Sequence, residues 1–214
     1  MGNIFNYDGA LIQSVNKMVD CILLNLLWIL FSIPLFTIGA STTAFYYAVN
    51  KVVRNNRGYV WKEFLSSFQS NFKQSTGVWL ILLIIYGVGM MDCYVAYQFM
   101  QMGDVPQWIF VLIIVVLVLV TVWANYLFPY IARFSNTTKA IMKNAGYMMT
   151  VNIGWSLLLL ILLLVTVVLC LLVPLFVSFV PVIYMVFASK ILERVFRKYM
   201  TPEDLEAERE RNGR

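Results

Sequence analysis

The sequence predicts an all-α protein that crosses a membrane several times, and two observations support this fold class. Of its 214 residues, 61% are hydrophobic and 13% are charged, whereas soluble domains average about 45–50% apolar and about 25% charged residues. Long segments without a single charge cover residues 21–50, 105–132 and 144–189. A helix needs about 20 apolar residues to cross a bilayer, so the longest segment suffices for two crossings.

The first uncharged segment is interrupted by a proline, a glycine and several hydroxylated residues. A single helix of 30 residues would be about 45 Å long, which exceeds a hydrocarbon core of about 30 Å. Proline disfavours a helical conformation in the preceding residue, glycine often ends helices, and Ser or Thr often starts them. We therefore expect a helical hairpin whose first arm ends near the turn and whose second arm reaches Arg54, with a turn built from Pro34, Thr37, Gly39, Ala40, Ser41, Thr42 and Thr43. A single tilted crossing and a short re-entrant second arm are the alternatives.

Residues 59–75 carry apolar side chains at three- and four-residue spacing, which is typical of one helical face. Polar and mostly basic residues occupy the opposite face. This pattern predicts an amphipathic helix in the plane of the cytoplasmic membrane interface, or a helix that docks a cytoplasmic partner. Its candidate contact residues are Trp61, Phe64, Leu65, Phe68, Asn71, Phe72 and Lys73.

Four further crossings follow this amphipathic segment. We expect them over residues 77–100, 107–132, 146–173 and 175–191, with turns at residues 101–106 and at Pro174. Proline favours a turn at that position because it cannot donate a helical hydrogen bond. With the hairpin the total is six membrane helices, and with a single first crossing it is five.

The basic residues mark one side of the membrane. All but Lys17 lie in three regions, residues 50–76, 133–149 and 190–214, each beside an apolar segment. This is the pattern of cytoplasmic loops, so the net charge of +5 does not predict a nucleic-acid partner. We expect a single transmembrane domain at residues 1–200 and a charged cytoplasmic tail at residues 201–214. Six crossings would place both termini in the cytoplasm, and five would place the N-terminus outside.

The composition favours a non-enzymatic protein without a cofactor or metal ion. Histidine is absent, the three cysteines are isolated from one another, and no G-x-x-x-x-G-K segment occurs. We therefore expect neither catalytic nor metal-binding residues. Asp92 is the one acidic residue well inside a predicted crossing, and such residues are functional candidates. It is either a hydrogen-bonding group near the outer interface or an ion-coupling group.

Two segments resemble the YesL family of bacterial membrane proteins, a family of unknown function. The first is IPLFTIGASTTAFYYAVNKVVR and the second is FLSSFQSNFKQSTGVWLILL. The matching positions are Pro34, Thr37, Ile38, Gly39, Ala40, Ala44, Phe64, Phe68, Asn71, Phe72, Lys73 and Gln74.

The resemblance also implies a function. YesL-type proteins are typically encoded beside carbohydrate-uptake ABC permeases, solute-binding proteins, glycoside hydrolases and sensor kinases of Gram-positive bacteria. This implies an accessory component of carbohydrate ABC transport in the plasma membrane, with the lipid bilayer and permease subunits as partners. The alternatives are a small transporter with a polar cavity that includes Asp92, and a regulatory protein coupled to a sugar-responsive sensor kinase.

Overall fold

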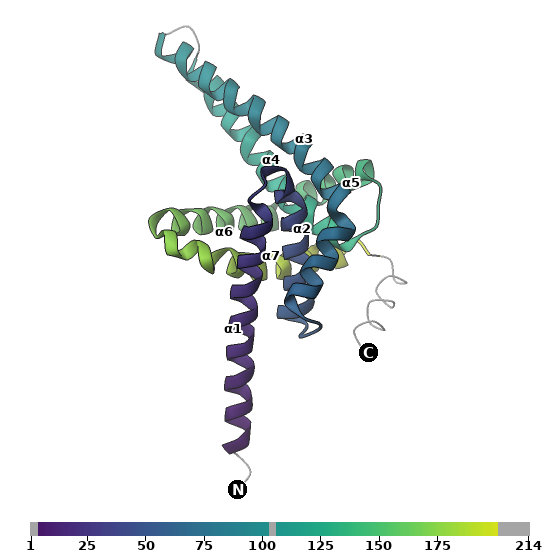
Figure 1. Ribbon diagram of the computed structural model, residues 1–214. Coiled ribbons are helices and arrows are strands. Elements are labelled where there is room, and N and C mark those ends of the chain that lie inside the picture. The colour runs from purple at the N-terminus through teal and green to yellow at the C-terminus, as the bar shows by residue number, and fades with distance from the viewer. Residues whose placement is uncertain (1–3, 103–105, 201–214) are drawn as a thin grey trace.

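The computed structural model describes residues 4–102 and 106–200, and side chains from Val15 onward. The tail predicted at residues 201–214 and part of the turn predicted at residues 101–106 lie outside this range. The secondary-structure elements of the described residues are all helices joined by short turns (Figure 1). They are α1 Ile4–Ser32, η1 Leu35–Thr37, α2 Ile38–Ala48, η2 Val49–Arg54, α3 Val60–Met102, α4 Gln107–Arg133, α5 Thr138–Val151, α6 Ile153–Leu172, η3 Pro174–Ser178 and α7 Val180–Arg197.

Four helices of the described part are long and apolar enough to cross a membrane, namely α1, α3, α4 and α6. This confirms a multi-pass helical membrane protein but does not show six crossings. Helix α2 has 11 residues and continues without a break into the six residues of η2, which together are at the lower limit of the length that crosses a bilayer. Eight residues of α2 are buried, so the protein itself covers most of this helix. The crossing expected at residues 146–173 is divided at Asn152, where the backbone leaves the helical conformation between α5 and α6.

The predicted helix–turn–helix is present, but its hydroxyl groups act differently from the prediction. Helix α1 ends at Ser32, and α2 begins at Ile38, before Ser41 and Thr42. Thr37 closes the turn because its hydroxyl lies 2.6 Å from the Phe31 carbonyl oxygen and 2.7 Å from that of Pro34. Ser41 and Thr42 therefore lie inside α2 and tie it to α1, through Ser32 Oγ at 3.0 Å and Trp28 Nε1 at 3.3 Å.

Gly39 does not end the first arm as expected but lies in the first turn of α2, against α3. A Cβ atom at this position would lie 2.5 Å from Trp79 Cβ and 2.6 Å from the Ser75 carbonyl oxygen. The hydroxyl oxygens of Thr43 and Ser75 then lie 2.9 Å apart across the same contact. Glycine is needed here because it allows the two backbones to approach closely.

The amphipathic segment is continuous with the following crossing in the 43-residue helix α3, unlike the separate interfacial helix that we expected. Its aromatic face is covered by the protein itself. Phe64 is fully buried, and the rings of Phe64 and Phe68 pack against Phe31 of α1 with centroid distances of 5.5 and 4.9 Å. The three- and four-residue spacing of the apolar side chains thus reflects packing against α1. The sequence pattern alone does not distinguish a helical face that packs against protein from one that contacts lipid.

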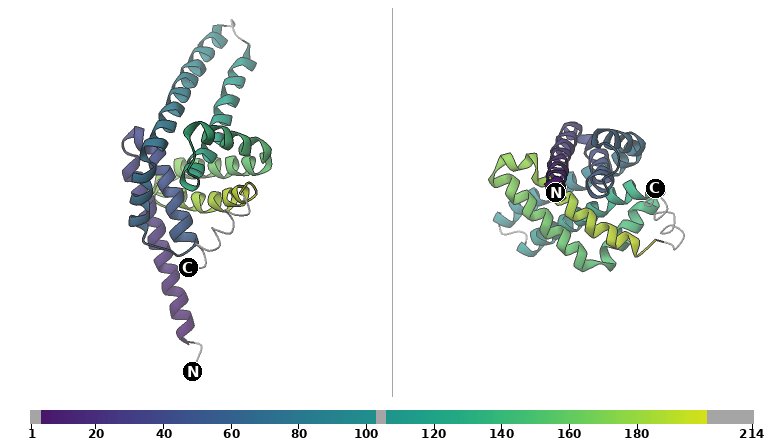
Figure 2. Two further views of the ribbon diagram at one scale, coloured as in Figure 1. Left: turned by 90° about the vertical axis from the view of Figure 1, so that its right-hand side faces the viewer. Right: turned by 90° about the horizontal axis from the view of Figure 1, so that it is seen from below.

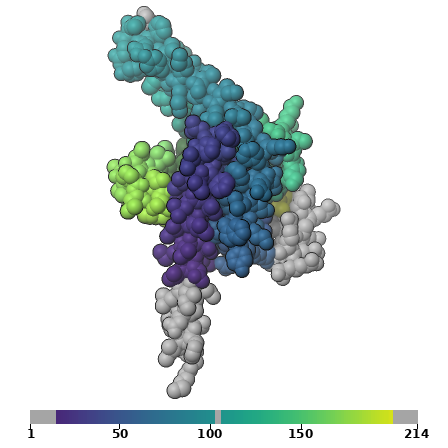
Figure 3. Space-filling model, viewed as in Figure 1, coloured from purple at the N-terminus to yellow at the C-terminus, as the bar shows by residue number. Residues whose placement is uncertain are grey.

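Two helical hairpins extend in different directions from the central helix α2. Helices α3 and α4 are antiparallel neighbours, and the end of α3 from about residue 90 to 102, with the start of α4 from residue 107 to about 118, projects away from the body as an arm (Figures 1 and 3). The second hairpin, α6–η3–α7, lies crosswise to this arm (Figures 1 and 2). Helix α2 packs against α1, α3, α4 and α7, so residues from most of the chain meet around it.

Candidate functional site

A cavity of about 490 Å³ lies where the C-terminal end of α2 and η2 meets the ends of α4 and α7. Five basic residues and one acidic residue are among the described residues that line it. The complete lining consists of Tyr46, Tyr47, Asn50, Lys51, Arg54, Asn55, Arg57, Ala132, Arg133, Phe134, Glu193, Arg197 and Met200. We call it the basic cavity. Its bases come from all three basic regions of the sequence, which the fold brings to one place.

A π-helical turn forms one wall of the basic cavity. Residues 49–54 continue α2 with the wider π-helical pairing, which is often found at functional sites. Tyr46, Asn50 and Arg54 follow at four-residue intervals and therefore point to one side. The turn ends where Asn55 Nδ2 donates to the Asn50 carbonyl oxygen at 2.8 Å and Asn56 adopts a φ of 52°.

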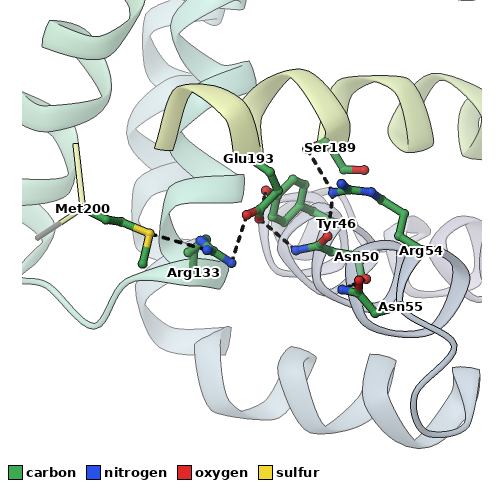
Figure 4. Close-up of polar contacts among 8 residues, drawn as sticks. All are labelled: Tyr46, Asn50, Arg54, Asn55, Arg133, Ser189, Glu193 and Met200. Carbon is green, nitrogen blue, oxygen red and sulfur yellow. Dashed lines mark hydrogen bonds and ion pairs between the residues drawn. The ribbon is translucent and has the colours of Figure 1, made fainter. Parts of the chain in front are cut away.

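Glu193 of α7 lines the cavity, and its side chain contacts residues of α2, η2 and α4 (Figure 4). The whole residue is 4% exposed. Its Oε1 atom accepts hydrogen bonds from Tyr46 Oη and Asn50 Nδ2, both at 2.8 Å. The other oxygen, Oε2, lies 3.0 Å from Arg133 Nη1 at the end of α4. Both carboxylate oxygens are thus occupied, which fixes α2, α4 and α7 relative to one another.

Arg54 and Lys51 lie closer to the rim and are held by other partners. Arg54 Nη1 donates to Asn50 Oδ1 at 2.7 Å and to the Ser189 carbonyl oxygen at 3.2 Å (Figure 4). Lys51 Nζ lies 2.7 Å from Glu63 Oε2, in an ion pair whose lysine side chain is 38% exposed. Arg54 is therefore positioned by neutral acceptors, and its positive charge is not cancelled by them.

Burial and charge shift two titrating groups of this wall in the same direction. Burial, followed by the neighbouring carboxylate of Glu193, raises the pKa of Tyr46 well above its ordinary value of 10.0. For Lys51, burial lowers the pKa, but hydrogen bonds with Glu63 and Tyr47 outweigh it, and the net pKa is raised above 10.5. Both groups therefore keep their protons more tightly in the folded protein than in the unfolded chain.

We expect the buried Tyr46 hydroxyl to make the protein sensitive to alkaline pH. A raised folded pKa gives stability that is complete below the unfolded value of 10.0 and is lost as the pH rises toward the folded value. Tyr46→Phe should lower stability by about 1–2 kcal/mol at neutral pH through the lost hydrogen bond to the carboxylate. Its unfolding midpoint should then fall less steeply above pH 10.

Thermal unfolding followed by tryptophan fluorescence between pH 7 and pH 11 measures this difference. Tyr59→Phe is the matched control, since Tyr59 is 73% exposed, and its curve should follow the wild type. Parallel alkaline slopes for Tyr46→Phe and the wild type would contradict the assignment.

A second, smaller cavity of about 170 Å³ lies between α2, α4, α6 and α7 and has no charged residue in its lining. Near it, Asn125 accepts a hydrogen bond from Tyr184 Oη at 2.5 Å and donates to the Thr121 carbonyl oxygen at 2.8 Å. Pro129 of α4 also lines it and cannot donate to the carbonyl of Asn125. This cavity is apolar in character and offers no cluster of titratable groups.

The residues proposed from the sequence do not line the basic cavity. The turn residues Pro34 and Thr37 connect α1 with α2, and Gly39 contacts α3. The aromatic residues of α3 from Phe64 to Phe72 pack against one another and against α1. Trp61 and Lys73 are exposed, Leu65 is half-buried, and Asn71 Nδ2 donates to the Ser67 carbonyl oxygen at 3.0 Å. The turn residues and the buried aromatic residues among them thus hold α1, α2 and α3 together, whereas Trp61 and Lys73 lie on the surface.

Asp92 is exposed on the projecting part of α3 and lines neither cavity. Glu193 is a site residue that no sequence pattern marked, since it appears in the sequence as one acid among the bases of KILERVFRK. The spacing of Tyr46, Asn50 and Arg54 was visible, but only the fold places it opposite Glu193 and Arg133.

The basic cavity is suited to binding an anion. Among the described residues, no three or more Asp, Glu, Cys or His side chains are grouped as metal ligands. Its carboxylate is paired with Arg133 and occupied by two further donors, which disfavours a role as a general base. Its guanidinium and amide groups are hydrogen-bond donors that match anionic oxygens.

Comparison with known proteins gives one match. Residues 21–93 match the family model described as "Protein of unknown function, DUF624", which is the family of YesL-type membrane proteins. No curated protein and no solved structure matches the chain. The matched residues include the C-terminal part of α1, all of α2 and η2, and most of α3, and so they contain one wall of the basic cavity. The chain therefore contains a DUF624 domain at residues 21–93.

Proposed function

We propose that this protein is a non-enzymatic accessory component of carbohydrate ABC transport in a bacterial plasma membrane. The resemblance to YesL-type proteins supports the transport context. The observation that carries the proposal is the exposed Asp92 on the arm of α3 and α4. The permease subunit is the partner to which this arm would bind.

The position of Asp92 calls for a partner within the membrane. Ten residues separate Asp92 from Met102 at the end of α3, which places the carboxyl group about 15 Å along the helix from the end of the arm. Asp92 has no hydrogen bond or ion pair with any residue that the structure describes. Ionisable side chains in membrane helices almost always face protein or water rather than lipid. A polar or basic group on a neighbouring membrane protein would satisfy it.

The rest of the arm fits a helix–helix contact in the bilayer. Around Asp92 the exposed residues are large and apolar, including Met91, Tyr94 and Val95. On the side facing α4, Gly89 packs so closely that a Cβ atom would lie 2.5 Å from Leu117 Cδ2. The two helices of the arm therefore support each other, and their outer faces remain available to a partner.

Co-purification from native membranes in a mild detergent tests the proposal. We expect subunits of a carbohydrate ABC permease to co-purify with the wild-type chain. Asp92→Asn should reduce the recovered permease about threefold or more, because it removes the negative charge that would pair with a basic group of the partner while it keeps the size of the side chain. Met91→Leu is the matched control on the same arm and should leave recovery unchanged.

Three outcomes would contradict parts of this proposal. If the wild type brings down no permease subunit, the accessory role is wrong. Recovery of a sensor kinase in its place would favour the regulatory alternative. Equal recovery with the wild type and Asp92→Asn would remove Asp92 from the contact. The transporter alternative requires Asp92 in a polar cavity, and neither cavity described above includes it.

A further inference from the structure

We infer that the exposed side of α7, together with Trp155 at the start of α6, binds the headgroups of anionic phospholipids at the surface of the bilayer. This inference goes beyond the accessory role proposed above and does not depend on the permease contact. It rests on the order of the exposed residues along α7, on the position and free N–H of Trp155, and on the charge balance among the described residues of α5, α6 and α7.

The exposed residues of α7 form one stripe along the helix. Their spacing of three or four residues places them on the same side, and they are Ile183, Phe187, Lys190, Arg194, Arg197 and Lys198. The first two are apolar and the others are basic, so the stripe changes character once. This order suits a helix whose exposed side passes from the acyl chains of a bilayer to its headgroups.

We call Ile183, Phe187, Lys190, Arg194 and Lys198, together with Trp155, the α7 face. Arg197 is left out of it, because this residue also lines the basic cavity. The α7 face is therefore a surface separate from that cavity.

Trp155 marks the level of the membrane surface on the α7 face. It lies in the first turn of α6, one of the candidate crossings, and tryptophan is enriched where crossings enter the interface. Helices α6 and α7 run side by side (Figures 1 and 2), and Arg194 Cζ lies 5.1 Å from the centre of the Trp155 ring. Phe187 lies two turns before Arg194, which is about 10 Å along the helix. Arg194 is therefore at headgroup level and Phe187 at the level of the acyl chains.

The indole N–H of Trp155 is available to a lipid oxygen. Trp28, Trp79 and Trp123 donate through Nε1 to oxygen atoms of the protein. Trp155 is half-buried, and its Nε1 has no such acceptor within the part of the chain that the structure describes. The N–H of a tryptophan in this position usually finds a hydrogen-bond partner, and a phosphate or ester oxygen of a lipid would supply one.

The end of α5 adds basic and aromatic groups beside the α7 face. The ring of Tyr147 lies 6.0 Å from that of Tyr199, and Lys198 Nζ lies 5.9 Å from the Tyr199 ring. Lys143 lies one turn before Tyr147 on the exposed side of α5. The break at Asn152 brings these groups to α7, because Asn152 Nδ2 donates to Tyr199 Oη at 2.9 Å. Cations and rings from three helices therefore lie together.

No acidic group balances these cations among the described residues. Helices α5 and α6 contain no Asp or Glu. Glu193, the one acidic residue of α7, is buried and pairs with Arg133. Lys190 and Arg194 contact aromatic rings but form no ion pair with a residue that the structure describes. Anionic lipids attract such basic groups, whereas a zwitterionic headgroup carries no net charge.

The alternative occupant of the α7 face is the tail at residues 201–214, which carries five acidic and three basic residues. The apolar half of the stripe favours lipid instead. Ile183 is 47% and Phe187 50% exposed, and covering them requires apolar groups. A phospholipid brings acyl chains and an anionic headgroup in one molecule, and so it fits both halves of the stripe.

Lipid retention by the full-length protein tests the inference. The protein is reconstituted in nanodiscs with equal amounts of phosphatidylcholine and phosphatidylglycerol, extracted into a mild detergent, and analysed for bound lipid by mass spectrometry. We expect the wild type to retain about threefold more phosphatidylglycerol than phosphatidylcholine, and Lys190→Gln/Arg194→Gln to retain the two about equally, because each base near the surface attracts anionic lipid. Lys62→Gln/Lys73→Gln is the matched control, since it removes the same charge from exposed positions of α3 and should keep the preference.

Fluorescence quenching covers the case in which the α7 variant does not fold. Trp155→Phe removes one emitter, so the difference between its emission and that of the wild type isolates Trp155. Phosphatidylglycerol brominated on its acyl chains should quench this difference more strongly than brominated phosphatidylcholine. Equal quenching by the two lipids would contradict a preference for anionic lipid at Trp155.

The inference is overturned if the wild type retains both lipids equally, or if the α3 control loses the preference as fully as the α7 variant. A full-length variant with a neutralised tail tests the other occupant, and its changes are Glu203→Gln, Asp204→Asn, Glu206→Gln, Glu208→Gln and Glu210→Gln. An unchanged preference in this variant supports lipid as the occupant. A preference that appears only in this variant shows that the tail covers the α7 face, and it also overturns the inference.

Discussion

Replacing Glu193 by glutamine should lower the thermal unfolding midpoint by about 10 °C. The carboxylate is buried and accepts from Tyr46, Asn50 and Arg133. Glutamine keeps one acceptor oxygen, but it leaves the charge of Arg133 without this carboxylate. Breaking a buried ion pair in this way costs about 3–5 kcal/mol, and in a chain of this size each kcal/mol shifts the midpoint by about 2–4 °C.

The ion pair between Lys51 and Glu63 provides the control for this experiment. Its lysine side chain is 38% and its glutamate side chain 14% exposed, against 16% and 6% for Arg133 and Glu193, so water screens this pair more strongly, and screened pairs contribute about 1 kcal/mol or less. Glu63→Gln should therefore change the midpoint by only a few degrees. Both variants are compared with the wild type by tryptophan fluorescence in the same detergent. Equal shifts for the two variants would show that Glu193 is not the link that joins α2, α4 and α7.

A side chain at position 39 should disrupt the contact between α2 and α3. A Cβ atom would approach Trp79 Cβ to 2.5 Å, the Ser75 carbonyl oxygen to 2.6 Å and Phe128 Cε1 to 2.9 Å. Two of these three neighbours belong to α3 near its backbone and cannot rotate away. Overpacking of this kind costs about 1–3 kcal/mol or more, which exceeds the gain of about 1 kcal/mol in helix propensity from glycine to alanine. We expect Gly39→Ala to be less stable than the wild type and Gly39→Leu to fail to fold.

Gly77 is the matched control because it also lies within a helix, where a Cβ atom would meet nothing within 4 Å. Gly77→Ala should therefore keep or raise the unfolding midpoint, through helix propensity alone. Size-exclusion chromatography and thermal unfolding of the three variants measure the difference. If Gly39→Ala is as stable as Gly77→Ala, the close approach of α2 and α3 at this point is wrong.

Much of the helical layout follows from local chemistry and was predicted from the sequence. Hydropathy placed apolar helices at residues 77–100 and 107–132, and Pro34 marked the turn after α1. The ends of α3 were predicted less well, since residues 59–75 and 77–100 are one helix in the structure. The break at Asn152 was missed, because this residue leaves the helix through contacts of its amide with Met148 and Tyr199. The second of these partners is distant in sequence.

The candidate site was predicted only in part. The three basic regions were visible in the sequence, yet they were interpreted as markers of membrane topology alone. Glu193 and Arg133 stand 60 residues apart, and Glu193 lies 147 residues from Tyr46. No periodicity connects positions so far apart, because their proximity arises from the packing of α4 and α7 around α2.

Local composition is enough to show that this is a helical membrane protein, because uncharged apolar segments of about 20 residues are stable in a bilayer whatever the rest of the chain does. The charge pattern likewise places the basic residues beside the ends of these segments. Long-range packing, in contrast, is what buries α2 in the core, places aromatic residues of α3 against α1, and gathers basic residues around a cavity. A buried surface looks the same in sequence whether lipid or protein covers it, and only long-range packing distinguishes the two.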